Sequence, residues 1–252
     1  MNKLFATDLD GTLINNNEIR SNDRQAILKL QNKGNLVVVS TGRPYNAIQM
    51  LKDQYKIYAN YFVLLNGALI MDSTGSKIKQ EIIEKEVIEK ILYQVNDGNI
   101  DISVESGFKT YILTDCNNLP YPNKIKVNSI QEIDDDLSLI SLHMPNKEKA
   151  EIEELKNEIN NKYGDKIIAY RNDIYIDIVP IGCSKGNGVE YLANQELIKS
   201  ENLYTIGDSW NDISMFNITP NSFTFNHVEE ELKKHTRYIV NSVSHCIEDY
   251  IL

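Results

Sequence analysis

Hydrophobic residues at the start of the chain form short unbroken runs, separated by a stretch with the spacing of an amphipathic helix. Residues 3–8 form one run that ends in polar residues, and residues 37–39 and 62–65 form two more. Apolar residues recur at helical spacing over 26–30, and Gly34 follows them. Strands that are apolar on both faces are typical of a buried parallel sheet, so this alternation predicts right-handed βαβ units.

From about residue 82 the pattern changes to one of half-polar strands and amphipathic helices. Apolar and polar residues alternate over 100–105, 140–144 and 174–178, and apolar helical stripes run over 87–95 and 152–159, ending near Gly98 and Gly164. Alternation of this kind predicts an α+β domain whose sheet has one face on a core and one face in solvent.

The first pattern returns at residues 203–206, after a helix expected to begin near Lys185. The simplest interpretation is an α/β fold with a doubly wound, Rossmann-like parallel sheet. We expect residues 1–81 and 181–252 to form this core, and residues 82–180 to form an inserted α+β domain. A small hairpin is expected around residues 72–75.

Composition and charge exclude several classes of protein. The chain has 252 residues and a formal net charge of −10, which disfavours binding to nucleic acid polymers and to anionic membrane surfaces. No apolar stretch reaches the roughly 18 residues of a spanning helix. Cys116, Cys183 and Cys246 match no zinc-site spacing and cannot all pair in disulfides. We therefore expect a cytoplasmic protein, whose oligomeric state the sequence leaves open.

Polar residues follow the predicted parallel strands, which would bring them to one edge of the sheet. Asp8 and Asp10 follow the first strand, the segment Thr41-Gly42-Arg43-Pro44 follows the second and opens a helix, and Asn66 follows the third. Each feature alone is equally consistent with a turn or a helix cap. Open α/β sheets bind ligands at the carboxyl ends of their strands, so together these residues predict a site there.

The fourth strand end adds the group Asp208, Asn211 and Asp212, which follows residues 203–206. Asp208 adds a carboxylate to the pair at Asp8 and Asp10, and three hard oxygen ligands with water suit Mg²⁺ better than a soft metal. Lys185 would supply the local cation that an anionic substrate needs on so acidic a protein.

With these motifs in order, the sequence resembles the haloacid dehalogenase-like phosphohydrolases, and within them the Cof-type subfamily IIB with its large α+β cap. The resemblance covers essentially the whole chain and rests on these segments: Asp8-Leu9-Asp10-Gly11-Thr12, Ser40-Thr41-Gly42-Arg43, Asn66-Gly67-Ala68, Ser184-Lys185-Gly186 and Gly207-Asp208-Ser209-Trp210-Asn211-Asp212. It implies that residues 82–180 are the cap that determines substrate specificity.

The resemblance also implies roles for single residues. Asp8 would be the nucleophile that forms an aspartyl-phosphate, and Asp10 the general acid and base. Mg²⁺ would be held by the Asp8 side chain, the Asp10 backbone carbonyl and Asp208. Asp212 would orient Lys185 or a metal-bound water, and Thr41 and Lys185 would be catalytic. The residues that would bind the phosphoryl group or the substrate are Thr41, Gly42, Arg43, Asn66, Lys185 and Asn211.

The function expected from these roles is hydrolysis of small phosphate monoesters, either sugar phosphates or cofactor and nucleotide phosphates. Two alternatives remain: a phosphomutase of the same superfamily, and a phospho-accepting regulatory or binding protein. Among residues set aside, His143 is expected on the surface of the inserted domain, and Tyr175 is expected to pack within it. The sequence does not identify the substrate.

Overall fold

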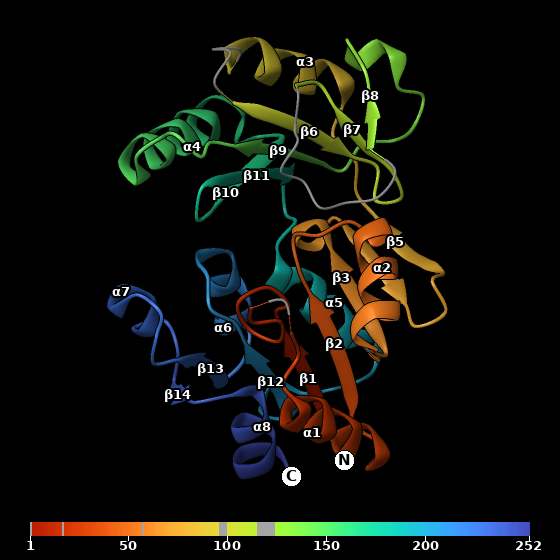
Figure 1. Ribbon diagram of the computed structural model, residues 1–252, viewed down its shortest axis with the longest axis vertical. Coiled ribbons are helices and arrows are strands. Elements are labelled where there is room, and N and C mark those ends of the chain that lie inside the picture. Colours follow the sequence, from red (N-terminus) through yellow and green to blue (C-terminus); the bar gives the residue numbers. More distant parts are fainter. Residues whose placement is uncertain (1, 17, 57, 96–99, 115–123) are drawn as a thin grey trace.

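The computed structural model of the protein describes residues 2–252 except 17, 57, 96–99 and 115–123, and it contains two β-sheets stacked along its long axis (Figure 1). The predicted helix end at Gly98 and the cysteine Cys116 lie outside the described residues. No helix in the described part is long and apolar enough to cross a membrane.

The first sheet has eight strands in the order β14-β13-β12-β1-β2-β3-β4-β5. Six of them are parallel: β1 (Leu4–Thr7), β2 (Leu36–Ser40), β3 (Tyr61–Leu64), β12 (Leu203–Ile206), β13 (Asn221–Phe225) and β14 (Tyr238–Val240). The expected hairpin is present as the antiparallel strands β4 (Leu69–Asp72) and β5 (Lys77–Gln80) at one edge.

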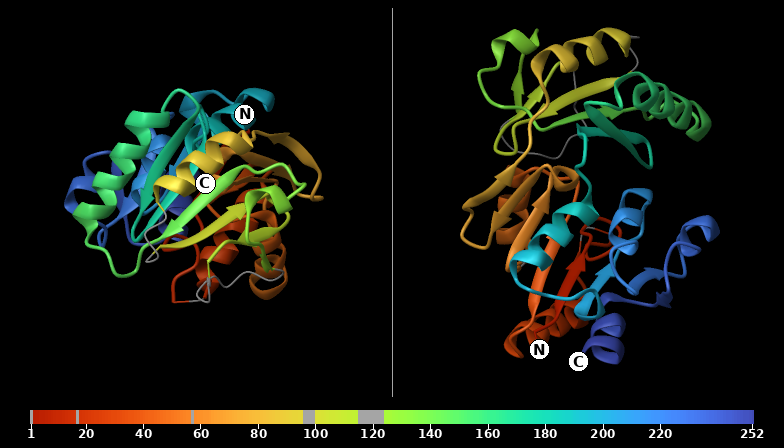
Figure 2. Two further views of the ribbon diagram at one scale, coloured as in Figure 1. Left: turned by 90° about the horizontal axis from the view of Figure 1, so that it is seen from above. Right: turned by 180° about the vertical axis from the view of Figure 1, so that it is seen from behind.

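Helices cover both faces of this sheet, which makes a three-layer α/β/α sandwich (Figure 2). On one face, α1 (Ser21–Asn32), α2 (Tyr45–Tyr55) and α8 (Val243–Cys246) pack over a core that includes Phe5. On the other face, α5 (Lys185–Gln195) and α6 (Ile213–Phe216) pack over Leu4 and Ala6. Strand β1 is therefore buried on both faces, as its continuous apolar run predicted, and the doubly wound fold class is confirmed.

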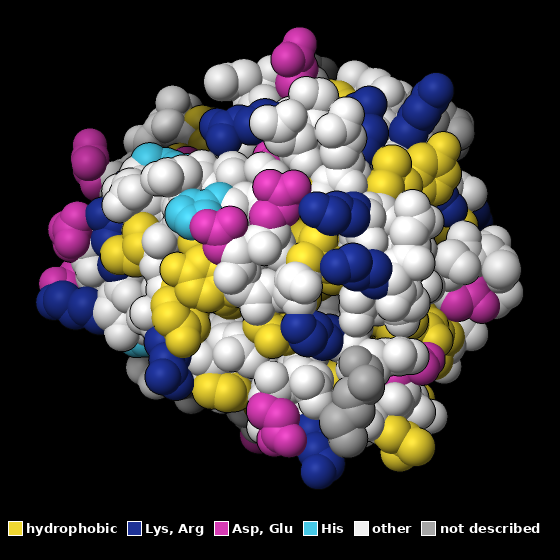
Figure 3. Space-filling model, turned by 90° about the horizontal axis from the view of Figure 1, so that it is seen from below, with side chains coloured by type: hydrophobic (Ala, Val, Ile, Leu, Met, Phe, Trp, Pro, Cys, Tyr) yellow, Lys and Arg dark blue, Asp and Glu magenta, His cyan; other side chains and the backbone are white. Residues whose placement is uncertain are grey.

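Short helical turns complete this part of the chain. They are η1 (Leu65–Gly67), η3 (Ser200–Asn202), η4 (Trp210–Asp212), α7 (Glu230–Lys233) and the π-helical turn η5 (Ile247–Ile251). The end of the molecule farthest from the second sheet carries basic, acidic and hydrophobic side chains interspersed (Figure 3). Such a mixture is typical of an ordinary solvated surface.

The second sheet has six strands in the order β10-β11-β9-β6-β7-β8. They are β6 (Asp101–Glu105), β7 (Thr110–Ile112), β8 (Lys124–Lys126), β9 (Leu139–His143), β10 (Ile167–Asn172) and β11 (Tyr175–Pro180). Helices α3 (Lys85–Gln94) and α4 (Lys149–Tyr163) pack on one face through a separate hydrophobic cluster, and η2 (Ile130–Glu132) lies beside α3.

The other face of the second sheet is not in solvent, contrary to the sequence-based expectation. Ser103 and Glu105 are each 2% exposed and Asp177 is 6% exposed, although all three occupy the polar positions of the alternating strands. The reason is that this face turns toward the carboxyl ends of the first sheet, which covers it (Figure 1). The polar positions are therefore buried without being part of a hydrophobic core. The boundaries at residues 82 and 180 stay a prediction.

Candidate active site

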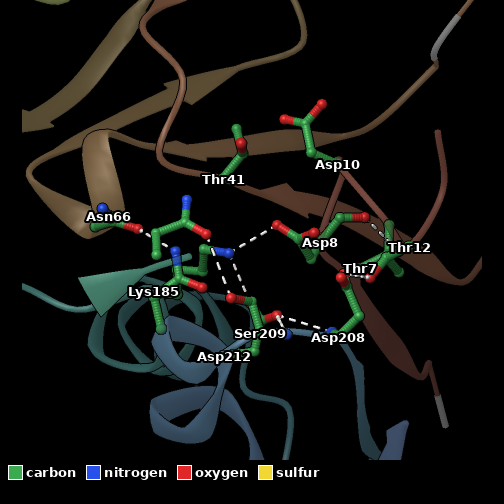
Figure 4. Close-up of polar contacts among 12 residues, drawn as sticks. Thr7, Asp8, Asp10, Thr12, Thr41, Asn66, Lys185, Asp208, Ser209 and Asp212 are labelled. Carbon is green, nitrogen blue, oxygen red and sulfur yellow. Dashed lines mark hydrogen bonds and ion pairs between the residues drawn. The ribbon is translucent and has the colours of Figure 1, made fainter. Parts of the chain in front are cut away.

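The residues predicted at the strand ends meet in one place at the carboxyl edge of the first sheet (Figure 4). Asp8 directly follows β1, Thr41 follows β2, and Asp208 lies in the loop between β12 and η4. Asn66 lies in η1 after β3, and Lys185 is the first residue of α5. The topology rather than sequence proximity brings them together, because β1, β2, β3 and β12 are neighbours in the sheet.

Lys185 lies at the centre of the site and joins two carboxylates. Its Nζ is 2.7 Å from Oδ1 of Asp8 and 2.6 Å from Oδ1 of Asp212. Only 2% of the Lys185 side chain is exposed, and both acidic partners are also buried. An ammonium group in such a place needs charged partners, since burial without them would force it to lose its proton. The two carboxylates therefore keep Lys185 charged and hold it in position.

Asp212 acts as the brace for this arrangement. Its second oxygen, Oδ2, accepts hydrogen bonds of 2.9 Å from the backbone N–H groups of Asp208 and Ser209. The Ser209 side chain in turn caps η4, which forms a reciprocal capping box with Asp212. Both Asp212 oxygens are thus engaged, one fixing Lys185 and the other fixing the loop that carries Asp208.

Asp208 is held against the first loop of the chain. Its Oδ1 accepts a hydrogen bond from the hydroxyl of Thr12. Gly11 has φ of +83°, and a Cβ added there would lie 2.2 Å from Oδ2 of Asp208. Glycine is required at this position both by the left-handed backbone and by the closeness of the carboxylate. The loop after β1 and the loop after β12 therefore fit together only because residue 11 has no side chain.

Burial and mutual repulsion raise the pKa values of the acidic groups. Burial raises the pKa of Asp8 well above its usual range; Lys185 opposes this, while Asp212, Asp208 and Asp10 reinforce it. Burial and the neighbouring Asp212 raise the pKa of Asp208 to about 6. Burial pulls the pKa of Lys185 down, but Asp212 and Asp8 outweigh it and the net direction is upward. The site concentrates more negative charge than one lysine neutralises.

This excess of carboxylates fits a divalent cation. Asp8, Asp208 and Asp212 each offer an oxygen, and these oxygens lie within 4.8 Å of one another. A set of carboxylate oxygens suits a hard cation such as Mg²⁺. Because Asp212 already uses both of its oxygens, Asp8 and Asp208 are the side chains better placed to bind the ion.

Asp10 lies apart from the acidic cluster, and its side chain points toward Arg43 instead. The Arg43 guanidinium binds the Asp10 carboxylate through two hydrogen bonds, Nε to Oδ2 at 2.6 Å and Nη2 to Oδ1 at 2.7 Å. This bidentate geometry is the strongest form of an arginine–carboxylate pair. This pair fixes the Asp10 side chain above Asp8, at the wall of the cavity described below. Because both side-chain oxygens are engaged, the Asp10 atom expected to bind the metal is still its backbone carbonyl oxygen, as predicted.

Thr41 and Gly42 form the turn between β2 and α2. The Thr41 hydroxyl accepts a hydrogen bond of 3.2 Å from the backbone N–H of Arg43, and the Thr41 side chain is buried. A Cβ at Gly42 would lie 3.1 Å from Oδ2 of Asp177 on the second sheet. The turn thus touches both sheets, and its glycine gives the carboxylate of Asp177 room.

Asn66 connects the two sheets through hydrogen bonds. Its Nδ2 donates to Oδ2 of Asp177 at 2.9 Å, and its Oδ1 accepts from Nδ2 of Asn211 at 3.1 Å. Asp177 also accepts a 3.0 Å hydrogen bond from the hydroxyl of Ser141 on β9. A buried polar chain therefore runs from η4 through η1 to the second sheet.

A cavity of about 290 Å³ lies between the two sheets and contains these residues. Its floor and side walls come from the first sheet and the loops around it and include Asp8, Asp10, Thr41, Gly42, Arg43, Lys185 and Asn211, so the cavity contains most of the predicted site. Its roof comes from the second sheet, which sequence reasoning did not include. These roof residues are Ser103, Glu105, Leu139, Ser141, Asn172, Asp173, Tyr175 and Asp177. The polar half of the alternation in β6, β9 and β11 could have indicated Ser103, Glu105, Ser141, Tyr175 and Asp177. Leu139, Asn172 and Asp173 give no such signal.

Two interpretations of residues in the second sheet are corrected. His143 is buried rather than on the surface: its Nδ1 lies 3.1 Å from Oδ2 of Asp101. Its ring stacks on Tyr175 at a centroid distance of 4.5 Å. Tyr175 itself lines the cavity rather than only packing in the sheet. His143 and Asp101 lie on the same face of the sheet as the cavity residues and support Tyr175, a roof residue, from the side.

Comparison with known proteins gives one family. Residues 5–246 match the model of the haloacid dehalogenase-like hydrolases. A phosphatase for 5-amino-6-(5-phospho-D-ribitylamino)uracil from Bacillus subtilis, YcsE, is 24% identical and covers 95% of this chain and 90% of its own.

Solved structures share the fold over nearly the full length. A haloacid dehalogenase-like hydrolase from B. subtilis superposes with a TM-score of 0.87 at 23% identity, covering 99% of this chain and 100% of its own. The subclass IIB sugar phosphatase BT4131 superposes with a TM-score of 0.79 at 20% identity, covering 99% and 96%. The resemblance found in the sequence is confirmed.

Proposed function

The chain belongs to the haloacid dehalogenase-like hydrolases, and from that premise we propose that it is a Mg²⁺-dependent phosphatase that hydrolyses small phosphate monoesters through an aspartyl-phosphate. Among its curated relatives are proteins named as phosphatases. The observation that carries the proposal is the buried Asp8 on the cavity floor, bound by Lys185 and beside Asp208.

The first half of the reaction uses the floor of the cavity. Oxygen of the Asp8 carboxylate attacks phosphorus, and the bond from phosphorus to the leaving oxygen breaks. Lys185 and the turn at Thr41 stabilise the charge on the transferring phosphoryl oxygens. Asp10, held by Arg43 at the cavity wall, gives its proton to the leaving oxygen so that the product departs as an alcohol.

The second half regenerates the enzyme. Asp10, now ionised, takes a proton from water, and the resulting hydroxide attacks phosphorus and releases Asp8 together with inorganic phosphate. Mg²⁺ held by Asp8 and Asp208 would offset the repulsion between the anionic nucleophile and the phosphate dianion. The bidentate pair with Arg43 favours ionised Asp10, which is the form that the second half needs. To act as the acid of the first half, Asp10 has to be protonated and give up one of these two hydrogen bonds.

The experiment is hydrolysis of p-nitrophenyl phosphate by the purified protein. We expect turnover with Mg²⁺, loss of turnover after EDTA, recovery with Mg²⁺ and poor recovery with Ca²⁺, whose longer bonds displace the attacking carboxylate. Asp8→Asn should abolish turnover, because it preserves side-chain volume but removes the nucleophile. The matched control is Asp165→Asn at an exposed turn, which should match wild type.

Two results would contradict the proposal. Near-normal turnover by a folded Asp8→Asn protein would exclude the covalent mechanism. Full activity after rigorous chelation would exclude the role given to the metal. Circular dichroism of each variant establishes that an inactive protein is still folded.

A further inference from the structure

The roof of the cavity carries three carboxyl groups and, among its described residues, no lysine or arginine side chain. Resting on the proposed phosphatase function, we propose that the second sheet selects esters whose leaving group is uncharged and rich in hydroxyl groups. Leaving groups that carry a carboxylate or a second phosphate are rejected. Glu105, Asp173 and Asp177 are the specificity-determining residues.

Hydrogen-bond acceptors dominate the roof. Of its described residues, three carry carboxyl groups and three carry hydroxyl groups, namely Glu105, Asp173, Asp177, Ser103, Ser141 and Tyr175. Carboxylates accept hydrogen bonds and hydroxyls can both donate and accept, so this surface matches the hydroxyl groups of a polyol or sugar. The remaining roof residues are Leu139 and Asn172, so the described roof holds no lysine, arginine or histidine that would neutralise a negative charge.

The cations of the cavity are already engaged on its floor. Among the described residues that line it, the lysine and arginine side chains are Lys185 and Arg43. Lys185 is bound by Asp8 and Asp212, and Arg43 by Asp10. An anionic leaving group directed at the roof would therefore lose its hydration without meeting a free cation, and it would be repelled by the exposed carboxylate of Asp173.

The two buried carboxyl groups of the roof are held in place by their neighbours. Glu105 accepts a 2.7 Å hydrogen bond from the hydroxyl of Thr110, and burial raises its pKa to about 8. Asp177 is held by Asn66 and Ser141. Protonated Glu105 could donate to a substrate hydroxyl and ionised Glu105 could accept from one, so either form suits an uncharged leaving group.

An unpaired acceptor on the opposite wall supports the same inference. Asn211 is only 4% exposed and lines the cavity, and its side-chain Oδ1 has no hydrogen-bond partner among the described residues. A buried acceptor without a partner is costly, and a substrate hydroxyl would satisfy it. Hydrogen-bond acceptors therefore face the cavity both from the roof and from the wall that carries Asn211, and a substrate with several hydroxyl groups would supply the donors.

The test compares esters that differ mainly in charge. Two pairs serve: glucose 6-phosphate with 6-phosphogluconate, and glycerol 3-phosphate with 3-phosphoglycerate. We expect kcat/KM for the uncharged member to exceed that for the carboxylate member by at least ~tenfold in both pairs. For poor substrates, inhibition constants against p-nitrophenyl phosphate hydrolysis should show the same order.

A charge reversal at Asp173 tests the residue assignment. Asp173 is exposed in the turn between β10 and β11 with φ of +50°, a conformation that Lys56 also adopts in this protein with φ of +51°. Asp173→Lys should raise the carboxylate-to-uncharged ratio of kcat/KM by roughly tenfold. Asp165→Lys makes the same change of net charge at an exposed turn outside the cavity lining, and it should leave the ratio unchanged.

The outcomes separate this inference from the proposed function. Equal kcat/KM and equal inhibition constants within both pairs, with normal turnover of p-nitrophenyl phosphate, would overturn the inference and leave the phosphatase function standing. An equal change of ratio in both lysine variants would overturn the assignment to the cavity. Absence of turnover with every ester would refute the proposed function and the inference together.

Discussion

A single buried carboxyl group, Glu105, links the stability of the protein to pH. Burial raises its pKa from 4.5 to about 8, nearby Asp177 adds to the effect, and the hydroxyls of Thr110 and Ser103 oppose it. Between these two pH values the folded protein binds a proton that the unfolded chain releases. The contribution of Glu105 to stability is therefore present below pH 4.5 and is lost as pH rises through 8.

We predict that the free energy of unfolding of wild type and that of Glu105→Gln differ by an amount that depends on pH. Glutamine keeps the shape of the side chain but cannot ionise. The free energy of unfolding of wild type should fall relative to the variant by roughly 2–4 kcal/mol between pH 5 and pH 9. Urea denaturation at several pH values measures it. The exposed Glu158→Gln on α4 should follow wild type throughout; parallel curves for Glu105→Gln and wild type would contradict the prediction.

Single residues also show how far sequence reasoning reaches. Asp8 and Asp208 could be assigned to one site because a parallel sheet brings its strand ends together. Lys185, which opens a helix, was added because an anionic substrate needs a local cation and because the family motif includes it. The orientation of Asp10 could not be predicted, because its pairing with Arg43 depends on the paths of two loops. His143 was misjudged because alternation identifies a polar position on a strand without showing what covers it.

At the scale of elements, the turn after β1 rests on Gly11. An alanine there would adopt an unfavourable backbone conformation, and its Cβ would collide with the carboxylate of Asp208. Gly34 is a matched control, because it has φ of +80° and a Cβ added there would have nothing within 4 Å. Alanine at either position would strain the backbone, but only alanine at residue 11 would also collide with Asp208. Comparing the two variants therefore distinguishes the effect of strain from the effect of the collision.

We predict that Gly11→Ala and Gly34→Ala each lower the free energy of unfolding by about 1–2 kcal/mol through strain. Only Gly11→Ala should also reduce Mg²⁺-dependent turnover, by roughly 10- to 100-fold, because displacing Asp208 disturbs the metal site. Thermal or urea denaturation and p-nitrophenyl phosphate hydrolysis measure the two effects. Equal losses of turnover in both variants would show that the collision is unimportant.

The strands themselves were largely predictable, but their environments were not. The apolar runs of β1, β2, β3 and β12 imply burial on both faces, and the structure agrees. The alternation in β6, β9 and β11 gives the strands correctly, yet the same pattern fits a face in water and a face that lines a cavity. Only the contact between two sheets decides between these, and that contact is not a property of any single strand.

At the scale of the whole molecule, the second sheet covers the cavity and also holds on to the first part of the fold. The backbone N–H of Tyr45 at the start of α2 donates to the carbonyl of Gly107 at 2.7 Å. Asn66 reaches Asp177 from below. These contacts hold the second sheet over the cavity, and in the proposed function it would form the roof under which the leaving group has to fit.

Replacing residues 82–180 with a short Gly/Ser linker should weaken discrimination among phosphate esters more than it weakens reaction with p-nitrophenyl phosphate. The measurement is kcat/KM across the same ester panel for both proteins, after circular dichroism confirms that the shortened protein is folded. An unchanged order of substrates and unchanged ratios would show that these residues do not determine specificity.

The alternation of the second sheet has a consequence for how such an enzyme can diversify. Along β6, one set of positions, Ile102 and Val104, belongs to the hydrophobic cluster under the helices, while Ser103 and Glu105 face the cavity. Mutations can therefore accumulate at every second residue without disturbing the packing that folds the sheet. A descendant of this protein could acquire a new substrate in few steps, because the positions that line the cavity are different residues from those that pack in the hydrophobic cluster.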